Sequence, residues 1–259
     1  MHILVTTDDG IEAPGLLALA QALRPLGQVS VLAPDRNWTA SGHTKTLDRP
    51  LRVRETSLAD GWPARSCDGA PSDCVALALL GLLPQPVDLI VAGINPGENI
   101  GQDVTYSGTI AAAMEAAIAG LPGIAVSLQF PEGTRANLDY GPAARAAARI
   151  TAQVLRNPLP MGILLNVNVP ALPEGQIRGM QVTRQGERIY HDQLVPRLDP
   201  RGRPYYWIGG DAPGGVPEEG TDFGALTRGY ISITPIQLDL TAHAYLDGLR
   251  AQIQTWDPR

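Results

Sequence analysis

Ile3-Leu4-Val5 leads directly into Thr6-Thr7-Asp8-Asp9-Gly10, so the apolar run that predicts the first strand ends at two adjacent carboxylates. Successive side chains on a strand point to opposite faces, so Asp8 and Asp9 converge on one ligand only where the chain has turned out of the sheet. Gly10 favours such a turn. Two close carboxylates repel each other and require a cation, a shared proton or abundant water. The pair therefore fits either a solvated loop or a hard-cation site.

The composition indicates a large acidic globular chain. It has 259 residues, of which 44% are hydrophobic and 18% charged, enough for one large α/β domain or a domain with an appendage. A formal charge of -6 argues against a surface that binds a nucleic-acid duplex, because that mode needs clustered Lys and Arg. Lys45 is the only lysine, so arginine carries nearly all the positive charge.

No part of the chain predicts a membrane association. The N-terminus runs straight into strand-like sequence, and the longest apolar stretch, Val75 to Leu83, is too short to cross a bilayer. We therefore expect a cytoplasmic protein. Cys67 and Cys74 have no metal or redox spacing and are expected to be core thiols.

Strand and helix patterns alternate from the N-terminus to about Pro170, which predicts an α/β fold with a doubly wound, mostly parallel sheet. Helices are expected at 14–23, 71–83 and 143–155, and a further one starts at Ser107 or Thr109. Strands are expected at 29–33, 51–54, 64–67, 87–93, 123–127 and 163–167.

Pro and Gly become frequent beyond Ala171, and the apolar pattern weakens. Short strands at 177–183 and 205–208 predict a β-rich extension used for oligomerisation, although a surface subdomain without that role fits as well. The pattern then returns to a strand at 230–235 and a closing helix at 240–254. We expect three parts: a catalytic core at 1–170, the extension at 171–229, and the return strand and C-terminal helix at 230–259.

Three segments rich in oxygen donors follow predicted strands, at the edge where open parallel sheets bind ligands. They are Asp8-Asp9, the loop from Thr39 to Lys45, and Asn95 with the 107–109 helix start. Carboxylate, amide and hydroxyl oxygens suit Mg²⁺, Mn²⁺ or Ca²⁺ rather than zinc. A helix N-terminus at Ser107-Gly108-Thr109 suits an anion, although ordinary capping explains it too. The pattern favours metal-assisted hydrolysis of a phosphate ester.

The chain resembles the SurE (stationary-phase survival protein) family of nucleotidases in one register from Met1 to about His243. The matching segments are Asp8-Asp9-Gly10, 33–37, 69–74, Gly93-Ile94-Asn95, 106–115, 182–184, 220–223 and 232–235. The resemblance implies a divalent-metal-dependent phosphatase that releases phosphate from nucleoside 5′- and 3′-monophosphates, with exopolyphosphatase activity in some members. It also implies a Rossmann-like core, and a dimer or tetramer built through exchanged C-terminal elements.

The resemblance places one divalent ion per subunit, Mg²⁺ or Mn²⁺ with Ca²⁺ as a substitute in crystals, on Asp8, Asp9, Thr39 and Asn95. Two residues depart from the family pattern, because Thr7 replaces an asparagine and Thr39 a serine. Thr39 keeps the hydroxyl, but its β-branch restricts the rotamer, and Ser41 is a nearby substitute.

These residues define a mechanistic hypothesis. The helix start at Ser107-Gly108-Thr109, with Asn95 and Ser41, binds the phosphate, and Asp9 orients or deprotonates the attacking water. His43 is a candidate proton donor to the leaving nucleoside oxygen, although a lone histidine in a polar loop is commonly structural. Trp38 is a candidate platform for a base or a packing residue.

Three other readings compete with this one. A haloacid dehalogenase-type phosphatase also begins with strand-then-aspartates, but it uses Asp-x-Asp, whereas here the aspartates are adjacent. A non-catalytic nucleotide sensor on a Rossmann-like fold would bind the same ligands without phosphate release. In a structural assembly module, the long C-terminal extension would be the functional part.

Overall fold

The computed structural model describes residues 1–130, 138–253 and 256. In this part of the chain, one large mixed sheet has the strand order β3-β4-β2-β1-β5-β6-β7-β11-β8, and a separate ribbon pairs β10 with β9. The large sheet consists of β1 (His2–Thr6), β2 (Gln28–Pro34), β3 (Val53–Ser57), β4 (Pro63–Cys67), β5 (Leu89–Pro96), β6 (Gly123–Leu128), β7 (Ile163–Val169), β8 (Met180–Val182) and β11 (Ile231–Gln237).

The middle of this sheet is parallel. β1 lies between β2 and β5, and β6 and β7 continue in the same direction. Antiparallel pairs occur only toward the two edges, where β3 pairs with β4 and β11 pairs with β7. Thr6 at the end of β1 lies opposite Ala92 of β5, so the loops that follow both strands leave the sheet at the same edge.

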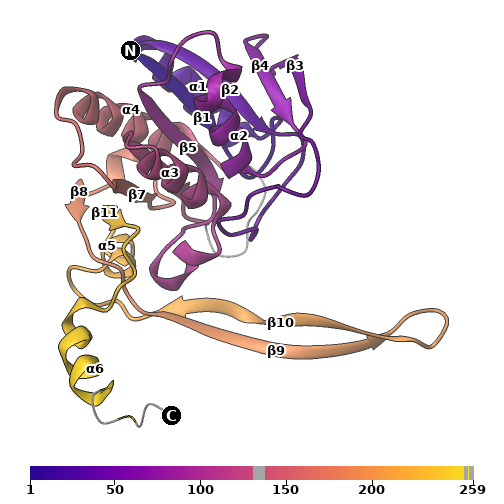
Figure 1. Ribbon diagram of the computed structural model, residues 1–259, viewed down its shortest axis with the longest axis vertical. Helices are drawn as coiled ribbons and strands as arrows, with labels where there is room; N and C mark the ends of the chain where they lie inside the picture. Colours follow the sequence, from indigo (N-terminus) through magenta and orange to yellow (C-terminus); the bar gives the residue numbers. More distant parts are fainter. Residues whose placement is uncertain (131–137, 254–255, 257–259) are drawn as a thin grey trace.

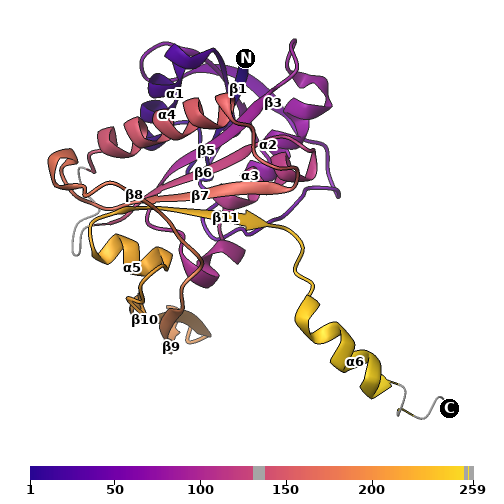
Figure 2. The same ribbon diagram turned by 90° about the vertical axis from the view of Figure 1, so that its left-hand side faces the viewer.

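Helices cover both faces of the sheet (Figure 2). One face carries α1 (Pro14–Leu23) and α4 (Gly141–Arg156), and the other carries α2 (Pro71–Leu77) and α3 (Gly108–Ile118). Within β1, Ile3 and Val5 pack on the first side and Leu4 on the second, and all three are fully buried. The predicted doubly wound α/β fold is confirmed.

Two elements differ from the sequence prediction. The strand predicted at 51–54 is observed at 53–57, because the turn from Leu58 to Trp62 sets the antiparallel register of β3 on β4. The helix predicted through Leu83 keeps regular α geometry only to Leu77 and continues as a π-helical segment, Ala78–Leu82. Gly81 has a φ of 100° there, which ends the helix.

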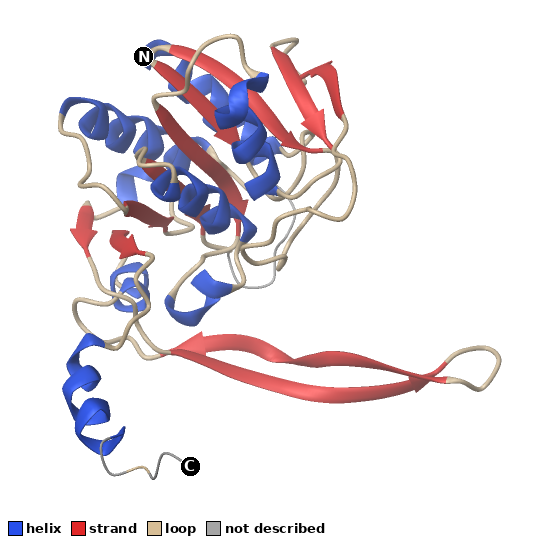
Figure 3. Cartoon of the chain, in the orientation of Figure 1, coloured by secondary structure: helices blue, strands red, loops and turns tan. Residues whose placement is uncertain are grey.

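The region from 171 to 229 contains a long arm (Figures 1 and 3). β9 (Arg188–Leu198) and β10 (Pro204–Gly215) form an antiparallel ribbon that projects away from the large sheet, with a turn at 199–203 at its tip. The predicted aromatic strand at 205–208 lies in β10, whereas its partner β9 has no equivalent sequence signal. The arm is the part of the structure that the alternating pattern of the core does not explain.

The chain re-enters the core after the arm. A short helix, α5 (Asp222–Thr227), packs near β11, which joins the large sheet beside β7. The closing helix predicted at 240–254 is observed as α6 (Leu246–Ile253), which lies away from the sheet (Figure 2). None of the helices in the described ranges is long and apolar enough to cross a membrane. The three-part division at 170 and 229 stays a prediction.

Candidate active site

The predicted carboxylate pair lies directly beyond the end of β1. Asp8 is almost completely buried, with 2% of its surface exposed, whereas Asp9 is half-buried. Thr109, in the first turn of α3, donates a hydrogen bond from Oγ1 to Oδ1 of Asp8. Ser107 caps the same helix, with its Oγ accepting a hydrogen bond from the Ile110 N–H at 3.1 Å. The structure therefore brings Asp8 against the N-terminus of α3.

Gly108 permits this close approach. A Cβ at this position would lie 2.8 Å from Asp8 Cβ and 3.0 Å from both Asp8 Oδ2 and Ser41 Oγ. Real Cβ atoms do not tolerate the first of these distances, so a side chain at 108 would displace Asp8 or the helix. Within the described residues, Ser41 Oγ is buried and has no hydrogen-bond partner. A buried hydroxyl group without a protein partner is the kind of group that a ligand satisfies.

The loop after β2 closes over the pair. The Trp38 N–H donates to the Asp8 carbonyl oxygen at 2.7 Å, and the Arg36 guanidinium lies over the Trp38 ring. Asn37 Oδ1 accepts a hydrogen bond from the Thr39 N–H at 2.7 Å, while its Nδ2 lies 3.4 Å from Asp9 Oδ1. This Asx turn fixes the backbone of Thr39, which is exposed.

The two carboxyl groups differ in environment, and both have raised pKa values. Burial raises the pKa of Asp8, although the Thr109 hydroxyl and the backbone N–H groups at 108 and 109 act in the opposite direction. Burial, followed by the negative charge of Asp8, raises the pKa of Asp9 to about 7. The charge of Asp8 thus disfavours the ionised form of Asp9, and a cation held by both carboxylates would offset that repulsion.

A cavity of about 590 Å³ opens beside Asp9. It is lined by Asp9, Pro14, Asn37, Thr39, Pro96, Phe130, Leu138 and Tyr140. Burial and the charge of Asp9 both raise the pKa of the Tyr140 phenol, which places that ring close to the carboxylate. The cavity therefore has polar groups at the Asp9 end and aromatic and aliphatic walls around it.

His43 and Lys45 contact a different carboxylate. His43 Nε2 lies 2.8 Å from Glu115 Oε1, and Lys45 Nζ lies 3.0 Å from Glu115 Oε2. Hydrogen bonding by His43, and then by Lys45, lowers the pKa of Glu115 despite its partial burial. The three side chains tie the loop after β2 to α3. Lys45, the one lysine of the chain, thus forms an ion pair with Glu115.

Asn95 lies near the end of β5, three residues beyond the register partner of Thr6. Its Nδ2 donates to the Gly97 carbonyl oxygen at 2.7 Å. No group of three or more His, Cys, Asp and Glu side chains in the described residues has the geometry to hold a metal. A cation at this edge would therefore need amide and hydroxyl oxygens beside the two aspartates, and Asn95, Thr39 and Ser41 supply that chemistry.

Two features of the site were not predicted from the sequence. Asn37 lies beside Asp9. The sequence did contain a signal for its role, because an asparagine in the turn after a strand commonly forms an Asx turn. Tyr140 reaches the cavity from the start of α4, more than a hundred residues away in the chain. No local sequence pattern indicates that Tyr140 and Asp9 line the same cavity.

Comparison with known proteins decides the family. Residues 3–192 match the family described as survival protein SurE. The chain belongs to the SurE family. It is 54% identical to the 5′-nucleotidase SurE of Herpetosiphon aurantiacus over 93% of this chain and 94% of that protein. The corresponding protein of Chloroflexus aggregans is 52% identical over 96% of this chain and 98% of its own length.

A solved structure supports the same assignment. The SurE protein from Aquifex aeolicus matches this chain with a TM-score of 0.81 and 39% identity, covering 98% of this chain and 100% of that one. The predicted membership of the SurE family and the predicted α/β fold are thus confirmed. The roles of individual site residues stay predictions.

The raised pKa of Asp9 predicts a pH-dependent stability for the metal-free protein. A carboxyl group whose folded pKa is about 7 stabilises the folded state below its unfolded pKa of about 4. That stabilisation is lost as the pH rises to 7. In EDTA, the melting temperature should therefore fall between pH 5 and pH 7.5 more steeply in the wild type than in Asp9→Asn.

Asp35→Asn is the matched control for this measurement, because Asp35 is exposed and follows the neighbouring strand β2. It should keep the wild-type slope. Parallel melting curves for wild type and Asp9→Asn would contradict the assignment of a raised pKa to Asp9.

Proposed function

We propose that the chain is a divalent-metal-dependent 5′-nucleotidase that hydrolyses nucleoside 5′- and 3′-monophosphates to nucleoside and phosphate. One observation carries the proposal: the chain is about half identical, over nearly its full length, to proteins named 5′-nucleotidase SurE, and its Asp8 carboxyl group packs against a helix N-terminus with Asp9 next to it. By extension, terminal phosphates of polyphosphate are candidate substrates.

Asp8, Asp9, Thr39 and Asn95 are the proposed ligands of one Mg²⁺ or Mn²⁺ per subunit. Their hard oxygens fit these ions, and the raised pKa values of both aspartates describe a pair that a cation would stabilise in its charged form. When bound, the ion supplies Lewis acidity toward the phosphate and toward water. Asp8 is held by Thr109, whereas the side-chain hydrogen bonds of Asp9 to other described residues are long, at 3.4 Å, and leave acceptor capacity for a ligand.

The phosphate is proposed to lie between the start of α3 and Ser41. Ser107, Gly108 and Thr109 present a helix N-terminus, whose partial positive charge favours an anion. Ser41 contributes the buried hydroxyl that lacks a partner. Asn95 is proposed to contact the same group from the β5 side.

Asp9 is the proposed general base. Its carboxylate lines the cavity and is held by long hydrogen bonds to Thr7 and Asn37, so it keeps a lone pair with which to accept a proton. His43 stays the proposed proton donor to the leaving oxygen, with Glu115 as the group that orients its ring. The contact between them makes Glu115 a further part of this hypothesis.

The nucleoside is proposed to occupy the cavity beside Asp9. Tyr140 and Phe130 give it aromatic walls, and an aromatic face stacks on any base without reading its edge. We therefore expect weak discrimination between purines and pyrimidines.

We also propose a cytoplasmic location. Cys67 and Cys74 are free and buried, which fits a reducing compartment.

The function predicts phosphate release from AMP and other nucleoside monophosphates with Mg²⁺ or Mn²⁺, and none with EDTA. Asp8→Asn should lower kcat/KM by at least about 100-fold, because it removes a ligand of the cation that would stabilise the charge of the transition state. Asp35→Asn should retain normal turnover. Tight nucleotide binding without phosphate release would support a non-catalytic sensor instead.

Thr39 and Ser41 can be separated by measuring metal and phosphate binding independently. Thr39→Val keeps the shape of the side chain without its hydroxyl and should raise the Kd for Mn²⁺ by about tenfold. Ser41→Ala should leave that Kd unchanged and raise KM by about tenfold, the loss expected for one hydrogen bond to a charged group. The reverse pattern would make Ser41 the metal ligand.

We propose that the arm assembles subunits into a dimer or tetramer. Leu194 and Ile208 lie opposite each other in the ribbon and are 70% and 84% exposed, and Trp207 is 64% exposed. An isolated two-stranded ribbon with exposed apolar side chains has little stability of its own. A second copy of the chain is the partner proposed to cover it.

The double variant Leu194→Asp with Ile208→Asp should therefore lower the molar mass measured by light scattering. Each charge would be buried in the interface at a cost that the contact cannot offset. Thr56→Asp, which adds one negative charge at an exposed position of β3 outside the arm, should keep the wild-type mass. An unchanged molar mass in the double variant would show that these arm residues do not hold the subunits together.

A further inference from the structure

The segment from Glu98 to Tyr106 connects two parts of the proposed site, because Asn95 precedes it and Ser107 follows it. Its first residues are fixed to the sheet. The Asn99 N–H donates to Asn168 Oδ1 at 2.8 Å, and Asn99 Nδ2 donates to Ser127 Oγ at 2.8 Å. The remainder forms a short 3₁₀ helix, Gly101–Thr105, which leads into the cap of α3.

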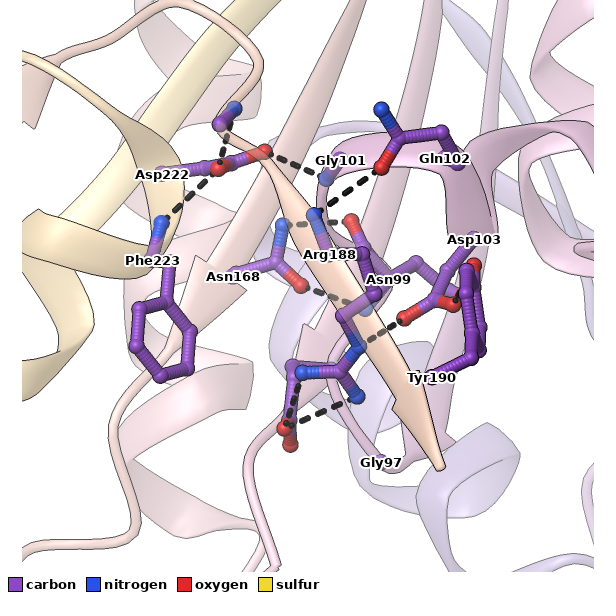
Figure 4. A network of polar contacts seen from close by, with 12 residues as sticks. Gly97, Asn99, Gly101, Gln102, Asp103, Asn168, Arg188, Tyr190, Asp222 and Phe223 are labelled. Carbon is purple, nitrogen blue, oxygen red and sulfur yellow. Dashed lines mark hydrogen bonds and ion pairs between the residues drawn. The ribbon is translucent and has the colours of Figure 1, made fainter. Parts of the chain in front are cut away.

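Arg188, the first residue of the arm, lies against this 3₁₀ helix (Figure 4). Its side chain is only 7% exposed. Its Nε lies 2.9 Å from Asp103 Oδ2, an ion-pair distance without the alignment of a hydrogen bond, and its guanidinium lies 3.5 Å from Glu98 Oε1. The Arg188 N–H donates to Gln102 Oε1 at 2.9 Å. One residue of the arm thus contacts three residues of the connecting segment.

Neighbouring contacts hold the same surfaces together. Tyr190 donates a hydrogen bond from Oη to Asp103 Oδ1 at 2.7 Å (Figure 4). The fully buried Asp222 accepts from the Gly101 N–H through Oδ2 and from the Gly186 N–H through Oδ1, both at 2.8 Å. A Cβ at Gly101 would lie 2.8 Å from the Gly186 carbonyl oxygen. The base of the arm and the 3₁₀ helix are therefore in direct backbone contact.

The other side of the 3₁₀ helix contacts the loop that carries Thr39 and Ser41. The Gly42 N–H donates to the Tyr106 carbonyl oxygen at 2.9 Å, and a Cβ at Gly42 would lie 3.3 Å from the Thr105 carbonyl oxygen. The positions of Ser107 and of Ser41 thus both depend on where residues 101–106 lie.

We propose that Arg188 is a positioning residue that places the phosphate-binding part of the site through Asp103 and Glu98. The proposal rests on the proposed function, since it assigns the 107–109 helix start and Ser41 to phosphate. Asn99 is held by β6 and β7, so loss of Arg188 should leave the Asn95 end unchanged. The proposed metal ligands Asp8 and Thr39 keep contacts of their own within the loop after β2, to the Trp38 N–H and the Asn37 side chain. Loss of Arg188 should therefore displace Ser41 and the 107–109 helix start more than the metal ligands. Phosphate affinity and metal affinity should therefore respond differently.

The test is Arg188→Gln in the full chain, with three measurements. The Kd for inorganic phosphate in the presence of Mg²⁺ and the KM for AMP should each rise about fivefold or more, within the range of couplings carried through packed networks. The Kd for Mn²⁺ should change less than twofold, and kcat should change less than KM, because ground-state and transition-state binding are lost together. Asp103→Asn should have a similar effect, and the two changes combined should be less than additive.

Arg203→Gln is the matched control. Arg203 lies on the same arm and pairs with Asp199, but the pair is at the tip and the arginine is 71% exposed. It should behave as wild type. If Arg188→Gln folds poorly, Arg188→Lys, which keeps the charge, should show the same order of effects at smaller size.

The proposal is overturned if Arg188→Gln and Arg188→Lys leave the phosphate Kd unchanged, or if metal and phosphate affinity fall together. Phosphate titration does not depend on turnover. A wild-type chain that binds phosphate but hydrolyses no nucleotide would therefore refute the proposed function separately.

Discussion

Burial of the Asp8 carboxyl group at the end of β1 is the constraint on which the rest of the site depends. An isolated carboxylate in a low-dielectric position costs several kcal/mol unless hydrogen bonds and positive charge compensate it. Here the compensation comes from the Thr109 hydroxyl and the N-terminus of α3. That helix must therefore begin directly against the strand end, and the close approach excludes any side chain at Gly108. Even so, the pKa of Asp8 stays raised, so the protein alone does not fully satisfy the charge.

The two adjacent aspartates have different environments, and this difference divides their tasks. The carboxyl group of Asp8 accepts a hydrogen bond from the Thr109 hydroxyl, which fixes its position between β1 and α3. Asp9 lines the cavity, and its carboxylate accepts long hydrogen bonds of 3.4 Å from Thr7 and Asn37. Its pKa of about 7 reflects both partial burial and the charge next to it. A carboxylate held in one position by Thr109, beside a second carboxylate that is open to the cavity, is an arrangement suited to holding a cation and moving a proton at the same place.

Local patterns predicted the core well because its elements follow local rules. Three local signals indicate elements of the core: Pro14 at the first position of α1, the Ser107 cap of α3 and the apolar run of β5. The same logic predicted that the candidate site residues gather at one edge of the sheet, since loops after parallel strands meet there; their roles stay predictions. Apart from the end of the 71–83 helix at Gly81, the features that the sequence did not predict are non-local. The register of β3 depends on its partner strand, and Tyr140 and Arg188 reach their neighbours across about ninety or more residues of chain.

The arm combines two surfaces of opposite character, and their order along β9 has a consequence for the site. Its inner end is polar and bound to the core through Arg188 and Tyr190, which lie two residues apart and so share one face of the strand. Its outer part exposes apolar side chains such as Leu194 and Leu198. The inner end and the outer part belong to one continuous strand, β9. A subunit that covers the outer part would therefore also restrain Arg188 and Tyr190, which contact Asp103. On the proposals made above, assembly would thus stiffen the phosphate-binding end of the site without supplying a residue to it.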